Sequence, residues 1–112
     1  VKKGLRVKCI WMFALALAVG GSVSFAANAG DVALGKQVFE QCKVCHATTT
    51  PNKKVGPSLM HLFKRAKLKN GKPMTEKNVR IMINDGGNGM PGYVQVLSPQ
   101  QRDQVIAYLK TL

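Results

Sequence analysis

The segment Cys42-Lys43-Val44-Cys45-His46 holds the residues with the most distinctive chemistry, two thiols three positions apart followed directly by an imidazole. This Cys-x-x-Cys-His pattern is typical of c-type haem attachment. At the end of a helix, thiols at this spacing can reach the two vinyl groups on one edge of a porphyrin, and the adjacent histidine can then ligate the iron. The pattern therefore predicts one haem c, covalently bound through Cys42 and Cys45, with His46 as an iron ligand.

A disulfide or a redox-active Cys-x-x-Cys pair is the plainer interpretation of the two cysteines. A thioredoxin-like pair belongs in a βαβ pattern, and no segment of this chain predicts a convincing pair of strands. A zinc site needs a second pair of ligands at close spacing, and the chain has no such pair besides the two cysteines of this motif. These comparisons favour haem.

Met90 is the expected second axial ligand, because a thioether is a known ligand of haem iron. Pro91 excludes Met90 from a helix. Gly86, Gly87 and Gly89 precede it and would let the backbone come close to a flat ring. We therefore predict an iron ligated by His46 and Met90.

The other methionines and the second histidine are weaker candidates. Met82 lies on the apolar face of a predicted helix, where core packing is the better interpretation. Met60 and Met74 lie among cations and are interpreted as residues that fill gaps in the packing. His61 would allow a bis-histidine iron, but its position in a basic stretch favours an exposed side chain.

Pro57 is the expected partner of the ligating imidazole. A histidine bound to a metal normally donates its other N–H to an acceptor that fixes the plane of the ring. The carbonyl of Pro57, in the sequence Gly56-Pro57, is the candidate acceptor. The alternative for this dipeptide is a plain turn.

Three helices are expected to position these residues. Asp31 can cap a first helix reaching about Gln41, and Thr75 a second that ends at 84–87. Ser98, with Gln101 completing a capping box, begins the last helix. Residues 53–77 are predicted as loop with short helical pieces near 59–65. The fold class predicted is all-α.

Residues 1–26 have the layout of a secretory signal peptide. Four cations in the first eight residues precede an uncharged apolar run over residues 10–19, and cleavage is expected after Ala26 or after Ala29. A retained membrane anchor is the alternative. The predicted organisation is a signal peptide, 1–26, and one domain, 27–112, with a periplasmic location and no stable membrane insertion after cleavage.

The positive charge is concentrated in one part of the chain. Glu76 is the only acid between positions 53 and 77. Eight cations lie there: Lys53, Lys54, Lys64, Arg65, Lys67, Lys69, Lys72 and Lys77. Nucleic acid is a common partner of such a patch, but export argues against it. A cationic face would instead steer the protein onto an acidic partner, in brief and salt-sensitive encounters.

Four motifs in order give residues 31–112 a resemblance to the small bacterial class I (mono-haem) cytochromes c. They are Gly35 to Phe39, Cys42 to His46, Gly56 to Leu59, and Met90-Pro91 before a helix bearing Tyr108. The resemblance implies helices packed around one haem, with the first and last helices crossing at Gly35 beside Phe39 and Tyr108. It also supports the roles expected for Pro57 and Met90.

The chain departs from that family's pattern in two respects. Many relatives have a tryptophan near a haem propionate, and some have an extra disulfide. Residues 27–112 contain no tryptophan and no cysteine outside the haem motif. The family's contacts to the haem propionates are therefore not predicted for this chain. The subgroup of cytochromes c that it resembles also stays open.

The resemblance implies a soluble periplasmic electron carrier that is a monomer and not an enzyme. It would shuttle single electrons between redox partners in a respiratory or dehydrogenase chain. Two alternatives stay open: a cytochrome subunit of a larger oxidoreductase, and a haem gas sensor or peroxidase in which the methionine ligand dissociates.

Overall fold

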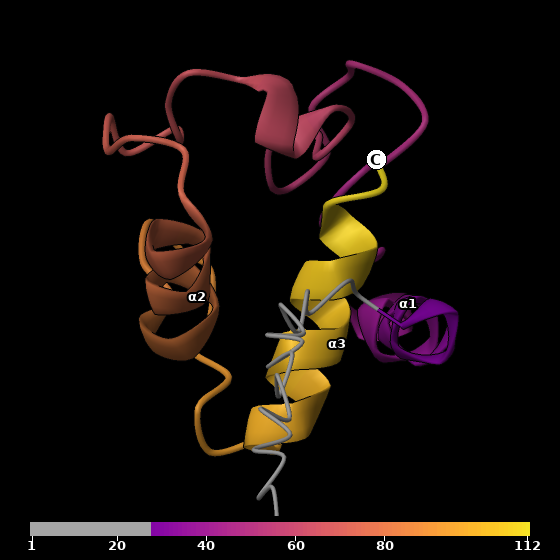
Figure 1. Ribbon diagram of the computed structural model, residues 1–112. Helices are drawn as coiled ribbons and strands as arrows, with labels where there is room; N and C mark the ends of the chain where they lie inside the picture. The colour runs from indigo at the N-terminus through magenta and orange to yellow at the C-terminus, as the bar shows by residue number, and fades with distance from the viewer. Residues whose placement is uncertain (1–27) are drawn as a thin grey trace, which may run out of the picture.

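Helices and loops make up the fold, without strands in the part that the structure describes. The structure is a computed structural model and describes residues 28–112, so the predicted signal peptide lies outside the described residues. Its elements are α1 (Ala29–Val38), a 3-10 turn (Phe39–Gln41), a second 3-10 turn (Leu62–Lys64), α2 (Glu76–Asp85) and α3 (Pro99–Leu109) (Figure 1). The predicted all-α fold and its three main helices are confirmed.

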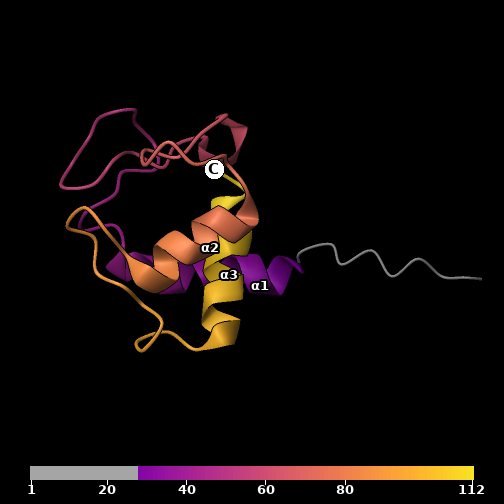
Figure 2. The ribbon, with the colours of Figure 1, turned by 90° about the vertical axis from the view of Figure 1, so that its left-hand side faces the viewer.

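Helices α1 and α3 cross at close range: Figure 1 shows α1 nearly end-on beside α3, and Figure 2 shows α1 running across α3. A glycine at the crossing makes this approach possible, because a Cβ on Gly35 would lie 1.9 Å from the carbonyl oxygen of Gln104. Beside it, the rings of Phe39 and Tyr108 pack in a tilted arrangement with centroids 5.3 Å apart. The crossing and its three residues are therefore as the resemblance implied.

The first helix begins earlier than predicted. It starts at Ala29, and the carbonyl of Asn28 accepts the N–H of Asp31 at 2.9 Å. Asp31 therefore lies in the first turn instead of at the cap. A carboxylate is favourable there because it faces the positive end of the helix dipole. The Asp31 carboxylate also accepts a hydrogen bond from the Gln104 side chain at 3.4 Å, which joins α1 to α3.

The other two helices begin at the predicted caps. The Thr75 hydroxyl accepts the N–H of Asn78 at 3.1 Å, which caps α2. At the start of α3 the Ser98 hydroxyl accepts the N–H of Gln101, and the Gln101 side chain accepts the N–H of Ser98 in return. This reciprocal pair satisfies backbone donors that no helical carbonyl can reach.

The core is small and lies between the three helices and the second 3-10 turn. Its buried members are Phe39, Leu62, Val79, Ile83, Val105, Ile106, Tyr108 and Leu109. Long loops connect the helices and run over one end of the core (Figure 1). None of the helices in the described range has the length and apolar character needed to span a bilayer. A core of this size usually needs an additional staple for stability.

Candidate functional site

The four residues expected to hold a haem line one cavity of about 460 Å³. They are Cys42, Cys45, His46 and Met90, which come from opposite halves of the described chain. Small-molecule and cofactor pockets occupy roughly 300–1000 Å³ and are mostly apolar. The apolar side chains of this cavity include Phe39, Leu59, Leu62, Val79, Ile83, Leu97, Val105 and Leu109. The cavity therefore has the size and character of a pocket for a large apolar cofactor.

A tight turn brings the two thiols and the imidazole to the same wall. It directly follows the 3-10 turn at the end of α1, and the Cys42 carbonyl accepts the N–H groups of Cys45 and His46 at 3.1 and 2.9 Å. Both thiols are free and partly buried. The sequence spacing and this turn together present three reactive groups to one side of the cavity.

The environment of Cys42 argues against a redox-active thiol pair. Burial, and then the nearby Cys45 thiolate, raise the pKa of Cys42 from 9.0 to about 11. Redox-active cysteines have the opposite shift, since the thiolate is the nucleophile and needs a lowered pKa. The site therefore favours an uncharged sulfur at position 42, which suits a thioether.

The imidazole of His46 is held by the dipeptide Gly56-Pro57. Its Nδ1 lies 2.7 Å from the Pro57 carbonyl oxygen. A carbonyl only accepts, so Nδ1 carries the proton and Nε2 is left with a lone pair that can ligate a metal. The N–H of Gly56 donates to the Cys45 carbonyl at 2.8 Å. A Cβ on Gly56 would lie 2.5 Å from Cε1 of His46. The close approach of Gly56 to the ring was not foreseen from the sequence.

Met90 is the last residue of a tight turn. This turn lies far from His46 along the chain, but both residues line the cavity. Gly87 and Met90 exchange backbone hydrogen bonds of 2.9 and 3.0 Å, and the residues between them, Asn88 and Gly89, have φ of 53° and 87°. Positive φ at both central positions is the requirement of a type I′ turn, for which Asn-Gly is a preferred pair. A Cβ on Gly86 would lie 2.2 Å from the Met90 carbonyl oxygen. These glycines therefore shape the loop itself.

The other candidate ligands occupy different places. Met82 is partly buried and lines the cavity beside Val79 and Ile83 of the same helix, which also belong to the core. Its predicted role in packing stays a prediction. Met74 packs against the core. His61 is exposed and does not line this cavity, in agreement with the surface position predicted for it.

Tyr93 lines the cavity, and no pattern in the sequence indicated this role. Its N–H donates to the Ile83 carbonyl at 2.8 Å, which ties the loop after Met90 back onto α2. Burial, and then the two cysteines, raise the pKa of the Tyr93 phenol. Tyr93 lines the same cavity as Cys42 and Cys45, which lie far from it along the chain, and no local pattern predicts such an arrangement.

Cationic side chains complete the cavity at one edge. Lys53, Arg65 and Lys69 all line it, together with the apolar residues. A haem has a large apolar ring and two carboxylates, so it needs apolar walls and a cationic or hydrogen-bonding edge. The donors present, two thiols, an imidazole and a thioether, are also those that attach and ligate a c-type haem. The residues of the cavity therefore fit this cofactor.

Comparison with known proteins agrees with this reading of the site. The sequence profile of the family described as "Cytochrome c" matches residues 32–112. The chain is also 35% identical to the protein "Cytochrome c2" of Blastochloris viridis, in an alignment that covers 95% of this chain and 93% of that protein. The chain belongs to the cytochrome c family, small class I type, and is an electron-transfer protein with covalently bound haem c and not an enzyme.

Proposed function

We propose that this protein is a soluble periplasmic carrier of single electrons, with one haem attached to Cys42 and Cys45 and ligated by His46 and Met90. The observation that supports this proposal most strongly is that all four side chains line the same apolar cavity. The predicted signal peptide supports the periplasmic location, and covalent haem attachment suits an exported protein.

The bound haem would supply the one-electron chemistry of its iron, and the surrounding protein would determine the reduction potential of that iron. His46 would present Nε2 to the iron, since Pro57 and Gly56 hold the ring from its other side. The Met90 thioether, as a soft ligand, would raise the reduction potential. The apolar walls would raise it further, because they disfavour the extra charge of the ferric state. Because His46 and Met90 would both ligate the iron, no ligand position would be left for a substrate.

The partners would be redox proteins with acidic surfaces. Among the described residues, the ion pairs of basic side chains use Lys43, Arg80 and Lys110, and none of the eight cations of residues 53–77 takes part in one. The charge of this lysine-rich segment is therefore not compensated within the described chain. Such a surface would speed association with an acidic partner at low ionic strength and lose this effect as salt is added.

The substitutions Met90→Ala and Met82→Ala test the ligand assignment, since both methionines line the cavity. Met90→Ala should abolish the optical signature of sulfur bound to ferric iron, lower the reduction potential, and let the reduced protein bind carbon monoxide. Met82→Ala should leave all three unchanged. Loss of the sulfur signature in Met82→Ala alone would contradict the assignment. Prompt carbon monoxide binding by the unaltered reduced protein at neutral pH would contradict the carrier function itself.

The mass of the exported protein tests the attachment and the location. The purified periplasmic protein should have the mass of residues 27–112, or of residues 30–112, plus one haem. Replacement of Cys42 by alanine should leave a haem attached by one thioether only, which shifts the reduced spectrum. A colourless product with the mass of the polypeptide alone would overturn the proposed cofactor site.

A further inference from the structure

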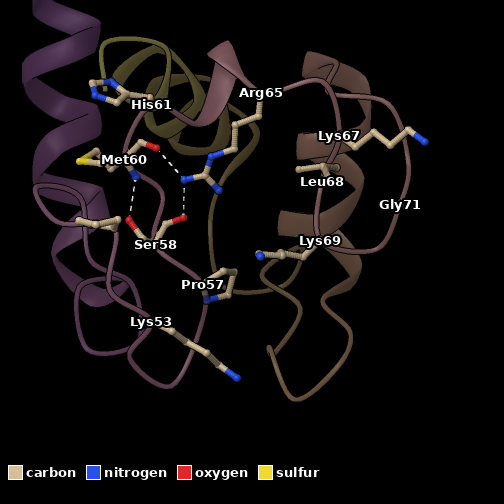
Figure 3. Close-up of a pocket in the computed structure, with 11 residues that line it drawn as sticks. Lys53, Pro57, Ser58, Met60, His61, Arg65, Lys67, Leu68, Lys69 and Gly71 are labelled. Atoms are coloured by element: carbon tan, nitrogen blue, oxygen red, sulfur yellow. Dashed lines mark hydrogen bonds between the residues drawn. The ribbon is translucent and has the colours of Figure 1, made fainter.

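Three arginines lie in the described part of the chain, and two of them have an evident role. Arg65 lines the haem cavity, and its guanidinium donates to two nearby backbone carbonyls at 2.9 and 2.6 Å (Figure 3). Arg80 forms ion pairs with two acidic side chains. The third, Arg102, forms no ion pair with any described residue. Its place in the fold therefore needs an explanation of its own.

Arg102 occupies a position where the pattern of α3 predicts an apolar residue. Val105, Ile106 and Leu109 form the buried stripe of this helix, and helical spacing places position 102 on the same face. The Arg102 side chain is partly buried, and its Nε is enclosed without a hydrogen-bond partner among the described residues. Partial burial of an unpaired charge is unfavourable. Residues that break a local pattern in this way are expected at functional or strained sites.

The Arg102 side chain reaches the last turn of α2. Its Nη1 donates to the Oδ1 of Asn84 at 2.9 Å, across eighteen positions of the chain. A hydrogen bond from a charged donor is stronger than one between neutral groups, and partial exclusion of water strengthens it further. This bond ties the start of α3 to the end of α2. The segment between the two bonded residues is the loop that carries Met90, which in Figure 2 leaves the end of α2 and leads to the start of α3.

The backbone of Asn84 holds the part of the loop that follows Met90. Its carbonyl accepts the N–H of Val94 at 3.2 Å. Gly92 lies against the same carbonyl, because a Cβ on Gly92 would be 2.6 Å from its oxygen. Asn84 therefore joins three parts of the fold, since it belongs to α2, bonds to α3 through its side chain and contacts the chain after Met90 through its backbone.

We infer that Arg102 is a positioning residue for the sulfur ligand of the iron, because through Asn84 it holds together the two ends of the loop that carries Met90. This inference rests on the proposed ligation by Met90 and goes beyond it, since it names a residue that keeps the sulfur in place. Separation of the ends of α2 and α3 would widen the loop and withdraw the sulfur. The Arg102–Asn84 bond opposes this motion, so it favours the ligated state over an open state that another ligand can enter.

The other polar links between α2 and α3 do not act on this loop. Arg80 pairs with Asp103, and Lys110 pairs with Glu76. In the described chain, none of these four side chains forms a hydrogen bond with residues 84–94. They can stabilise the pairing of the two helices without holding the loop. Arg80 is also partly buried, so its removal provides a matched control.

The substitutions Arg102→Met and Arg80→Met test the inference, because both replace a guanidinium that links α2 to α3 by an unbranched apolar side chain. The measurement is the binding of imidazole to the ferric holoprotein, followed by loss of the optical signature of sulfur bound to iron. Arg102→Met should bind imidazole at least about tenfold more tightly, and Arg80→Met less than about twofold more tightly. Arg102→Lys retains a charged donor and should have an affinity between those of Arg102→Met and the unaltered protein.

Two further measurements separate positioning from a general loss of stability. Methionine suits the apolar stripe of α3, so Arg102→Met should unfold at the same temperature as the unaltered protein or at a higher one. Asn84→Ala should tighten imidazole binding as Arg102→Met does, and the double variant should tighten it no further, because both changes remove the same bond.

Each contrary outcome overturns a distinct claim. Unchanged imidazole affinity in Arg102→Met, or an equal increase in Arg80→Met, would overturn the positioning role while leaving the ligation by Met90 intact. Additive effects of Arg102→Met and Asn84→Ala would overturn the path through Asn84. Absence of the sulfur signature from the unaltered ferric protein would instead overturn the proposed ligation, and with it this inference.

Discussion

The imidazole of His46 lies directly against the backbone of Gly56, with no room for a side chain between them. A Cβ at position 56 would be 2.5 Å from Cε1, 2.8 Å from Nδ1 and 3.0 Å from Nε2 of the ring. Gly56 therefore limits the ring on one side while Pro57 limits it through the hydrogen bond to Nδ1. Together these two neighbours determine the orientation in which the ligating nitrogen is presented.

The substitution Gly56→Ala should displace the ring of His46. No positive φ is found at this position, so the effect would come from the added methyl group and not from backbone strain. Forcing a methyl group into a packed site typically costs about 1–3 kcal/mol. We expect lower thermal stability, together with a changed reduction potential of the holoprotein. Asn52→Ala, at an exposed position of the same loop that does not line the cavity, should leave both quantities unchanged, and an unaltered potential in Gly56→Ala would contradict the positioning role.

Gly86 and Gly71 offer a pair for testing the loop that carries Met90. Both have positive φ, 69° and 82°, so alanine at either position incurs backbone strain of roughly 1–2 kcal/mol. Only at Gly86 would the new Cβ also collide, at 2.2 Å, with the carbonyl oxygen of Met90, since nothing lies within 4 Å at Gly71, which does not line the haem cavity. Gly86→Ala should therefore weaken the sulfur–iron signature of the ferric protein, and Gly71→Ala should retain it. Equal loss in both variants would show that a general loss of stability, and not the collision, controls the ligand.

The substitution Gly35→Ala should separate the two crossing helices. Alanine gains about 1 kcal/mol in helix propensity over glycine, but its Cβ would lie 1.9 Å from the Gln104 carbonyl oxygen. We expect a net loss of about 1–3 kcal/mol in the free energy of unfolding, measured by denaturant titration of the holoprotein. Leu34→Ala, at a neighbouring exposed position on α1, should change this free energy by less than about 0.5 kcal/mol. A stabilised Gly35→Ala variant would contradict the tight crossing.

The stabilising effect of Glu76 should depend on pH. Hydrogen bonds from Lys110 and then from Arg80 lower the pKa of the Glu76 carboxyl below its usual value of 4.5. An acid with a lowered pKa in the folded state stabilises the fold above its unfolded pKa, and this contribution is lost as pH falls through the folded pKa. Glu76→Gln should therefore reduce the free energy of unfolding at pH 7. The loss should be no more than about 1 kcal/mol, because the carboxylate is nearly half exposed and solvent screens the pairs.

Measurements of that free energy between pH 7 and pH 3 would check the prediction. The difference between Glu76→Gln and the unaltered protein should shrink below pH 4.5, and added salt should also reduce it. Glu40→Gln provides the control, since Glu40 pairs with Lys43 within one turn and joins no separate elements. A difference that stays constant over the whole pH range would indicate that the ion pairs make no contribution.

Local patterns were enough to predict the helices, because their ends are determined by nearby residues. The caps at Thr75 and Ser98 are formed by side chains that bond to backbone groups three positions ahead. The start of α1 was misplaced by three residues, since the helix begins at Ala29 and a cap at Asp31 would begin it at Val32. Asn28 supplies a backbone carbonyl there, and Asp31 is used in the first turn. Short-range hydrogen bonding explains both the successes and this error.

By itself the sequence determined the covalent chemistry of the protein. The Cys-x-x-Cys-His spacing specifies haem attachment within five residues, and the Gly-rich segment before Met90-Pro91 specifies a turn, because both depend on neighbours along the chain. Only the tertiary structure decided what faces the cavity. It placed Met82 and Tyr93 on the cavity wall and set Gly56 against His46. It also separated three cations that line the haem cavity, Lys53, Arg65 and Lys69, from the rest of the lysine-rich segment. These contacts join residues distant in sequence, and they are determined by how the helices and loops pack in three dimensions.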